Sequence, residues 1–318
     1  MSNILELEDL PGIGPAIRRR LIEGGFRTPE AVAVATPREL AAAAEIGEAT
    51  AIRIIEAARE KLNIGFQTAQ EYLHKRRTIS QITTGTRNLN QLLGGGIETR
   101  AITEFFGEYR TGKTQICHQL TVTVQLPPEL GGLSGEAAYI DTEGTFRPER
   151  LIPIATKFGL NPKQALKNIH YARAYNSDHQ LYLTQAIGDL IQEGKNIKLI
   201  VVDSLIGHFR AEYTGRDTLA ERQQKLNKHL HTLLKLSELH NLAVVVTNQV
   251  MTKPDAFFGD PTEPVGGHIT AHNCTTRIYL RRSKANQRIA RLVDSPHLPE
   301  AETLFKICLL YTSPSPRD

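Results

Sequence analysis

The residues best suited to chemistry form a glycine-rich segment that matches the phosphate-binding pattern G-x-x-x-x-G-K-T. Glycines permit the tight turn that points consecutive backbone N–H groups at the phosphates of a nucleotide. Lys113 supplies a compact positive charge, and Thr114 supplies a hydroxyl for Mg²⁺. We therefore predict that ATP is bound by Gly107, Glu108, Tyr109, Arg110, Thr111, Gly112, Lys113, Thr114 and Gln115.

Two carboxylates suit hydrolysis of the bound triphosphate. Asp203 ends an apolar run and can hold the Mg²⁺ shell together with Thr114. Glu143 follows a second apolar run, and a carboxylate near the γ-phosphate can orient and deprotonate a water molecule. We predict a Mg²⁺-dependent ATPase in which Glu143 is the general base and Lys113 is a second catalytic residue.

The elements that must position these residues are apolar runs that alternate with helix-forming segments from Ile82 onward. This alternation predicts an α/β fold with a mostly parallel sheet covered on both faces. After Thr275 the runs follow one another without helices, which predicts an antiparallel extension. The predicted strands are Ala101–Phe106, Ala137–Asp141, Ile169–Ala172, Leu199–Asp203 and Ala243–Asn248.

Residues 1–62 have a different character, with short Ala-rich helical segments broken by Gly and Pro. The segment Leu10–Ile17 contains Gly-Ile-Gly and precedes three arginines, and it resembles a helix–hairpin–helix module that grips phosphate without reading bases. Glu45–Thr50 looks like a second, degenerate copy. A tight helix–helix turn with a solvated arginine face remains the alternative.

Three further segments complete the predicted organisation. Residues 63–80 form a linker in which Phe66 and Ala69 are apolar residues in a polar stretch. The ATPase core covers 81–307. Residues 308–318 contain two prolines and no periodicity, so we set them apart as an atypical end with a non-native look.

Charge and cysteine usage narrow the class of protein. Residues 1–65 hold eight Lys or Arg and ten Asp or Glu, a net charge of −2. Because the whole chain carries +4, the remaining residues carry +6. A nucleic-acid partner is therefore expected on the larger part.

Three cysteines without metal-ligand spacing favour a reducing compartment, and no leader or long apolar run is present. We predict a cytoplasmic protein that does not enter a membrane.

Two loops after neighbouring strands suit contact with DNA. The first runs from Arg210 to Arg216, and the second from Val250 to Thr270, with Phe257 and Phe258 inside it. Arginine and aromatic side chains on loops can hold a nucleic-acid backbone and wedge bases. A lid over the nucleotide is the alternative.

Several blocks together resemble one protein family, the archaeal RadA recombinases, which are RecA-family relatives of the eukaryotic strand-exchange proteins. The similarity covers residues 5 to 307 in a single order, and it stops after Ile307, where the family usually closes with a strand and a short acidic end. The blocks are GEYRTGKTQ, YIDTEGTFRPERL, LIVVDS, FRAEYTGR, TNQV, PVGGH…AH and LVDSPHLPEAE.

The resemblance implies a RecA-like P-loop ATPase core with a helix–hairpin–helix domain before it. It also implies an ATP-dependent DNA recombinase that forms filaments on single-stranded DNA and pairs and exchanges homologous strands in recombination and repair. Double-stranded DNA and further copies of the chain, in a helical filament or a ring, are the other implied partners.

The same resemblance assigns roles residue by residue. Arg150 would stack on adenine, and Gln249 and His272 would sense the γ-phosphate. Phe66 and Ala69 match the F-x-x-A tether that docks into the next subunit, whose ATP is capped by the segment from Asp294 to Pro299. The implied DNA-binding residues are Arg210, Tyr213 and Arg216 in the first loop, and Phe257 and Phe258 in the second.

Two alternatives stay open. A hexameric ring ATPase, such as a helicase or clock-type kinase, shares the core, although the F-x-x-A segment and the hairpin domain speak against it. A regulatory DNA-binding paralogue would use ATP as a switch with little turnover, whereas the presence of Glu143 favours turnover.

Overall fold

The computed structural model describes residues 5–215, 217–252, 262–264 and 267–307. The predicted DNA-binding residues Arg216, Phe257 and Phe258, and the atypical end 308–318, lie outside the described residues. The chain divides between Thr78 and Ile79 into two compact units, which are described separately below.

The first unit is a small bundle of helices, as its sequence predicts. Thr28 and Thr36 accept hydrogen bonds from the backbone N–H groups of Ala31 and Glu39, and a proline follows each threonine. Such caps begin short helices because they satisfy N–H groups that have no partner within the helix. The helices are η1 (Leu7–Asp9), α1 (Pro15–Glu23), α2 (Pro29–Ala33), α3 (Pro37–Ala44) and α4 (Glu48–Lys61), around a core of Leu21, Val32, Leu40 and Ile54.

The predicted linker contains a helix, α5 (Ala69–Arg76). Thr68 and Glu71 exchange hydrogen bonds across its first turn in a capping box. This local pairing stabilises the start of a helix that has no buried residue, and such a cap contributes about 1 kcal/mol.

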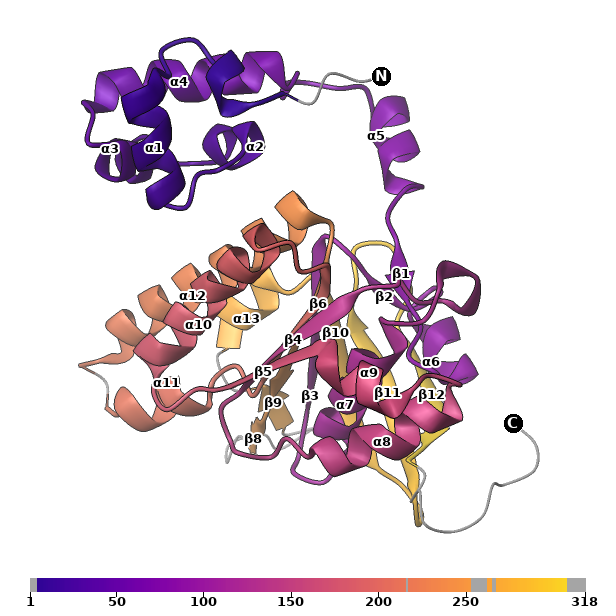
Figure 1. The fold of residues 1–318 in the computed structure, drawn as a ribbon. Coiled ribbons are helices and arrows are strands. Elements are labelled where there is room, and N and C mark those ends of the chain that lie inside the picture. Colours follow the sequence, from indigo (N-terminus) through magenta and orange to yellow (C-terminus); the bar gives the residue numbers. More distant parts are fainter. Residues whose placement is uncertain (1–4, 216, 253–261, 265–266, 308–318) are drawn as a thin grey trace. The chain divides into compact units, whose positions relative to one another are not determined.

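The second unit is built on an eight-stranded sheet (Figure 1). Its order is β12-β11-β10-β3-β7-β6-β4-β5, with the six strands from β10 to β5 parallel and β11 and β12 antiparallel. This confirms the predicted α/β class and the antiparallel extension. The strands are β3 (Ala101–Gly107), β4 (Glu136–Asp141), β5 (Ile169–Arg173), β6 (Ile197–Asp203), β7 (Ala243–Asn248), β10 (Thr276–Arg282), β11 (Gln287–Asp294) and β12 (Ala301–Lys306).

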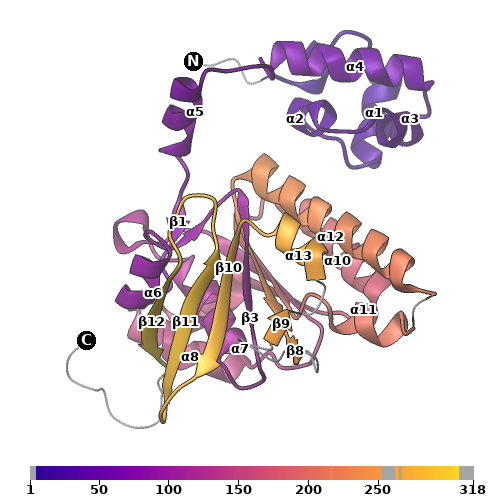
Figure 2. The ribbon, with the colours of Figure 1, turned by 180° about the vertical axis from the view of Figure 1, so that it is seen from behind.

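Helices cover both faces of this sheet (Figures 1 and 2). Side chains of one strand alternate between the two resulting cores: Val201 packs on one side, and Ile200 and Val202 on the other. Because both faces are buried, these strands read as continuous apolar runs. One face carries α6 (Arg87–Leu92), α7 (Lys113–Thr123), α8 (Pro148–Lys157) and α9 (Pro162–Lys167), and the other α10 (Ser177–Gln192), α11 (Gly207–Glu212), α12 (Leu219–His240) and α13 (Gly267–Asn273).

Short elements complete the unit. They are β1 (Gln81–Ile82), β2 (Ile97–Glu98) and η2 (Pro128–Leu130). In the part of the chain that the structure describes, no helix combines the length and the apolar character needed to cross a bilayer.

Both predicted DNA loops contain more regular structure than expected. Arg210 lies inside α11, so the first loop begins only after Glu212. In the second, β8 (Val250–Thr252) pairs antiparallel with β9 (Thr262–Pro264), and α13 already begins at Gly267. The prediction was wrong here because Gly and Pro suggested a continuous loop, whereas strand pairing and packing against α12 depend on tertiary contacts.

Candidate nucleotide and catalytic site

The predicted phosphate loop joins β3 to α7, and two of its glycines are required by space and backbone angle. A Cβ at Gly107 would lie 2.2 Å from the carbonyl oxygen of Leu280 on β10. Gly112 caps α7 with φ of 103°, which L side chains rarely adopt. The loop therefore turns tightly against the sheet and leads directly into the amino end of α7, the kind of helix terminus that binds anions.

Lys113 lies at the start of α7 and points back into the loop. Its Nζ donates to the carbonyl oxygens of Gly107 and Glu108, both at 2.8 Å. Burial lowers the pKa of Lys113, and the nearby charges of Asp203 and Glu143 oppose this effect. The ammonium group is thus close enough to interact electrostatically with Glu143, the predicted base, and with Asp203, the predicted metal ligand.

Asp203 ends β6 as a buried carboxylate. Tyr139 Oη donates to its Oδ2 at 2.7 Å, and the Thr247 hydroxyl donates to its Oδ1. Burial beside this carboxylate raises the pKa of Tyr139 well above its usual range, so the phenol stays a donor. A buried carboxylate such as that of Asp203 and a hydroxyl such as that of Thr114 are oxygen ligands of the kind that Mg²⁺ prefers alongside phosphate and water, so both residue types fit the predicted metal role.

Glu143 accepts two hydrogen bonds at a single carboxylate oxygen. Ser204 Oγ donates to Oε1 at 2.8 Å, and Gln249 Nε2 donates to the same atom at 3.1 Å. Ser204 follows β6, and Gln249 follows β7. The structure thus brings together four residues predicted from separate parts of the sequence, Lys113, Glu143, Asp203 and Gln249.

Asp141 holds the segment that carries Glu143, and the sequence analysis did not assign it a role. Its carboxylate accepts backbone N–H groups of residues 143 to 146 at 2.7–3.3 Å and pairs with Arg173 at 3.1 Å. An aspartate two residues before a turn often accepts such bonds, so the Asp-Thr-Glu-Gly order was the available signal.

His118 was also missed. It is fully buried in α7, and its ring stacks with Tyr139 and packs edge-on against Phe146, with centroids 5.8 and 5.3 Å away. Its Nε2 accepts a long hydrogen bond, 3.4 Å, from the backbone of Arg147. Burial lowers the pKa of His118 to about 4, so the ring is neutral and supports the same segment as Asp141.

Arg150, predicted to stack on adenine, is held next to the phosphate loop. Its Nε and Nη2 donate to Gln115 Oε1 at 3.2 and 2.9 Å. Both residues line a small cavity of about 90 Å³ with Thr84, Gln119 and Ile307.

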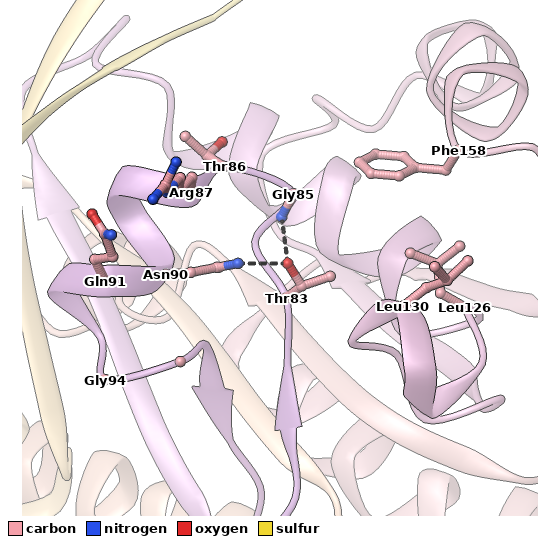
Figure 3. Close-up of a pocket in the computed structure, with 11 residues that line it drawn as sticks. Thr83, Gly85, Thr86, Arg87, Asn90, Gln91, Gly94, Leu126, Leu130 and Phe158 are labelled. Atoms are coloured by element: carbon pink, nitrogen blue, oxygen red, sulfur yellow. Dashed lines mark hydrogen bonds between the residues drawn. The ribbon is translucent and has the colours of Figure 1, made fainter. Parts of the chain in front are cut away.

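A separate cavity of about 710 Å³ lies elsewhere in the second unit (Figure 3). Leu126, Leu130 and Phe158 form one wall, and Thr83 and Asn90 lie opposite. The polar groups on the side of Thr83 and Asn90 already bond to each other. Thr83 Oγ1 accepts from Asn90 Nδ2 at 2.7 Å and from the Gly85 backbone N–H at 3.1 Å. Its size therefore does not make it the catalytic site, since none of Lys113, Glu143 or Asp203 lines it.

The predicted DNA-binding residue Arg210, in α11, lies near Gln249 and Ser204. Arg210 and Gln249 line one cavity of about 370 Å³, and Ser204 forms part of the same wall. Tyr213 follows α11, and its ring lies 5.1 Å from Lys225 Nζ on α12. His272 is exposed on α13, at the other end of the segment that Gln249 begins.

The predicted ATP cap, the segment from Asp294 to Pro299, does not reach the phosphate loop of its own chain. It connects β11 to β12 at the end of the sheet where β3 begins, whereas the phosphate loop follows the end of β3 (Figure 2). Leu298 packs over Gly94, which precedes β2 and β3. Asp294 and Pro299 are both exposed.

Comparison with known proteins agrees with this geometry. The model of the Rad51 family matches residues 75–309, and the model of the SAM-like helix–hairpin–helix tandem matches residues 4–60. The chain is 54% identical over 304 residues to the DNA repair and recombination protein RadA of Aeropyrum pernix, covering 96% of this chain and 95% of that protein. It is 55% identical over 306 residues to the protein of the same name from Metallosphaera sedula, covering 96% and 94%.

These matches confirm the RadA resemblance and, at the level of the family, the recombinase function expected from the sequence. They also account for the two units, because one family model covers the hairpin domain and the other covers the sheet. A RecA-like ATPase core that binds nucleotide comes with this family. The chain belongs to the Rad51 family of DNA recombinases.

Proposed function

We propose that the protein is an ATP-dependent recombinase that forms filaments on single-stranded DNA and catalyses homologous pairing and strand exchange. The observation that carries this proposal is the hydrogen bond from Gln249 to Glu143, which joins the predicted water-activating carboxylate to the start of a predicted DNA-binding segment. A nucleotide switch for DNA affinity needs a connection of this kind.

The proposed reaction is hydrolysis of ATP to ADP and phosphate. Lys113 and the amino end of α7 bind the phosphates, and the Glu143 carboxylate orients a water molecule and accepts its proton during in-line attack on the γ-phosphorus. Thr114 and Asp203 would hold Mg²⁺, which neutralises the charge that develops on the phosphate oxygens. Arg150 would contact the adenine.

The proposed assembly joins each chain to the next by two contacts. Phe66 is fully exposed and Ala69 begins α5, so both are available to a neighbouring core. The segment from Asp294 to Pro299 lies away from its own phosphate loop, which supports its use over the ATP of an adjacent subunit. Filament formation would thus complete the nucleotide site.

Single-stranded DNA is proposed to bind to the core through Arg210, Tyr213 and the segments around Arg216, Phe257 and Phe258. The hairpin domain would hold duplex DNA by phosphate contacts. In that domain Gly12 has φ of 89°, and the glycines Gly14 and Gly47 cap α1 and α4. Some of its arginines already have partners within the domain, since Arg18 pairs with Glu8 at 2.9 Å.

A cytoplasmic location remains a prediction.

A strand-exchange assay tests the recombinase proposal directly. The full chain is incubated with ATP, Mg²⁺, a circular single strand and a homologous linear duplex, and joint molecules are expected only with the homologous duplex. Electron microscopy of the same mixture separates the alternatives. Helical filaments support the proposal, closed rings on DNA would support a ring ATPase, and filaments without exchange or ATP turnover would support a regulatory paralogue.

A further inference from the structure

A buried ion pair joins β3 to β10, and a hydrogen bond extends it to β7 on the other side of β3. Glu104 on β3 is fully buried, and its Oε2 accepts a hydrogen bond from Arg277 Nε on β10 at 2.7 Å. Its other oxygen, Oε1, accepts from Asn248 Nδ2 on β7 at 2.9 Å. The strand register explains this meeting, because Arg277 lies directly opposite Glu104.

This pair is connected to Glu143 through two consecutive residues. Asn248 Oδ1 accepts the backbone N–H of Gln249 at 2.8 Å, and Gln249 Nε2 donates to Glu143 Oε1 at 3.1 Å. A carboxylate accepts hydrogen bonds and donates none. Asn248 must therefore present its NH₂ end to Glu104, which leaves its oxygen for Gln249, so Glu104 determines which way the Asn248 amide faces.

The arrangement is poorly explained by stability alone. Buried ion pairs are often no more stable than apolar side chains of similar size, because desolvation offsets the attraction. Within the described ranges, Arg277 Nη2 also lacks any hydrogen-bond partner. The guanidinium lies 5.3 Å from the ring of Phe106, the last residue before Gly107, so the pair contacts the strand that carries the phosphate loop.

We propose that Glu104 and Asn248, backed by Arg277, are positioning residues that hold Gln249 against Glu143. Through them, a movement of the proposed DNA-binding segment after Gln249 changes the contact between Gln249 and Glu143, and with it the rate of ATP hydrolysis. This inference rests on the proposed ATPase and DNA-binding function, which it deepens by naming the side chains that couple the two sites.

Glu104→Gln tests the orientation argument. The new amide can still accept from Arg277, but it turns its NH₂ group toward Asn248. The Asn248 amide must then turn its oxygen toward position 104 and away from Gln249. We expect the ratio of kcat with single-stranded DNA to kcat without it to fall by about tenfold. KM for ATP should stay within about threefold, because the phosphate loop is unchanged.

A second variant separates positioning from folding, since Glu104→Gln leaves a buried charge with a weaker partner. Glu104→Leu combined with Arg277→Met removes both charges and should fold with a thermal stability close to that of the wild-type chain. It leaves Asn248 without its carboxylate, so the stimulation ratio should stay low. Leu233→Ala is the control, because it truncates a buried residue of α12 and should lower stability without changing the ratio.

The outcomes are distinct. A low ratio in both Glu104 variants, with a normal ratio in Leu233→Ala, supports the proposal. A ratio restored in the apolar pair would show that the ion pair acts only on folding, and it would overturn the proposal. A wild-type chain that hydrolyses no ATP, or is not stimulated by DNA, would instead overturn the proposed function and this inference with it.

Discussion

Gln249 Nε2 lies 3.1 Å from Glu143 Oε1, and this hydrogen bond spans two strand ends that are separated by β6 in the sheet. The same oxygen accepts from Ser204. A carboxylate oxygen has two lone pairs, so Oε1 itself has none left for a water molecule while both donors stay in place. Withdrawal of Gln249, when its segment binds DNA or a γ-phosphate, would free one lone pair at the proposed base.

Two substitutions should separate nucleotide binding from chemistry. Lys113→Ala removes a charge that contacts phosphate before and during reaction, so ATP binding should weaken and turnover should be lost. Glu143→Gln keeps the shape of the site and removes the base, so ATP should still bind while hydrolysis falls by about 10²-fold or more. Nucleotide titration and phosphate release measure the two effects. Equal losses of ATP affinity in the two variants would contradict the assigned roles.

Phe66 should control assembly. It is a fully exposed aromatic residue, and we expect it to enter a pocket of the next chain, where an anchor contributes about 2 to 4 kcal/mol. Phe66→Glu should give monomers that still bind ATP, as measured by light scattering. Val34→Glu, at an exposed apolar position of the hairpin domain, is the matched control and should assemble normally. Unchanged oligomers of Phe66→Glu would show that the anchor lies elsewhere.

Arg216 should contact the phosphate backbone of single-stranded DNA. Replacing it with alanine should lower affinity and reduce the slope of log K against log salt by about 0.7, the value for one phosphate contact on a single strand. Titrations at several salt concentrations measure that slope. Arg291→Ala, which removes an exposed arginine paired with Glu300 at 3.0 Å, is the control and should leave the slope unchanged.

The hairpin domain should matter mainly for duplex DNA. Deleting residues 1 to 62 leaves Phe66 in place and removes a net acidic domain, so single-strand binding should persist while duplex capture is impaired. The same titrations against both forms of DNA test this. A truncated chain that loses more single-strand affinity than Arg216→Ala does would reverse the assignment of the two domains.

Stability should depend on pH through His229. This fully buried residue of α12 has its pKa lowered by burial from 6.5 to about 4. The unfolded chain therefore takes up a proton first as the pH falls, and stability present above pH 6.5 is lost progressively toward pH 4. The difference corresponds to about 3 kcal/mol at the low end of that range.

His229→Gln should accordingly lose less stability on acidification than the wild-type chain, by about 2 kcal/mol in urea denaturation. His231→Gln, at an exposed position of the same helix, is the control and should behave as wild type. The carboxylates are the same in all three chains, so their contribution to acid sensitivity cancels in the comparison. Identical acid sensitivity of His229→Gln and wild type would rule out this origin.

The sequence by itself determined the phosphate loop, the buried strands and the separate helical domain. Each depends on short-range patterns: the spacing of Gly107, Gly112 and Lys113, apolar runs such as that before Asp203, and caps that begin helices at defined residues. Glu143 and Gln249 could also be named in advance, because they match blocks of a recognisable family. Their mutual contact could not.

Only the tertiary structure decided which side chains meet. Asp141 reaches the amides that hold Glu143, Thr247 reaches Asp203, and Glu104 reaches Asn248 across 144 residues of chain. Strand order and register determine these contacts, and no local pattern encodes either of them. The helical setting of Arg210 was misjudged for the same reason, since packing of α11 against the sheet outweighs the loop signals that follow it.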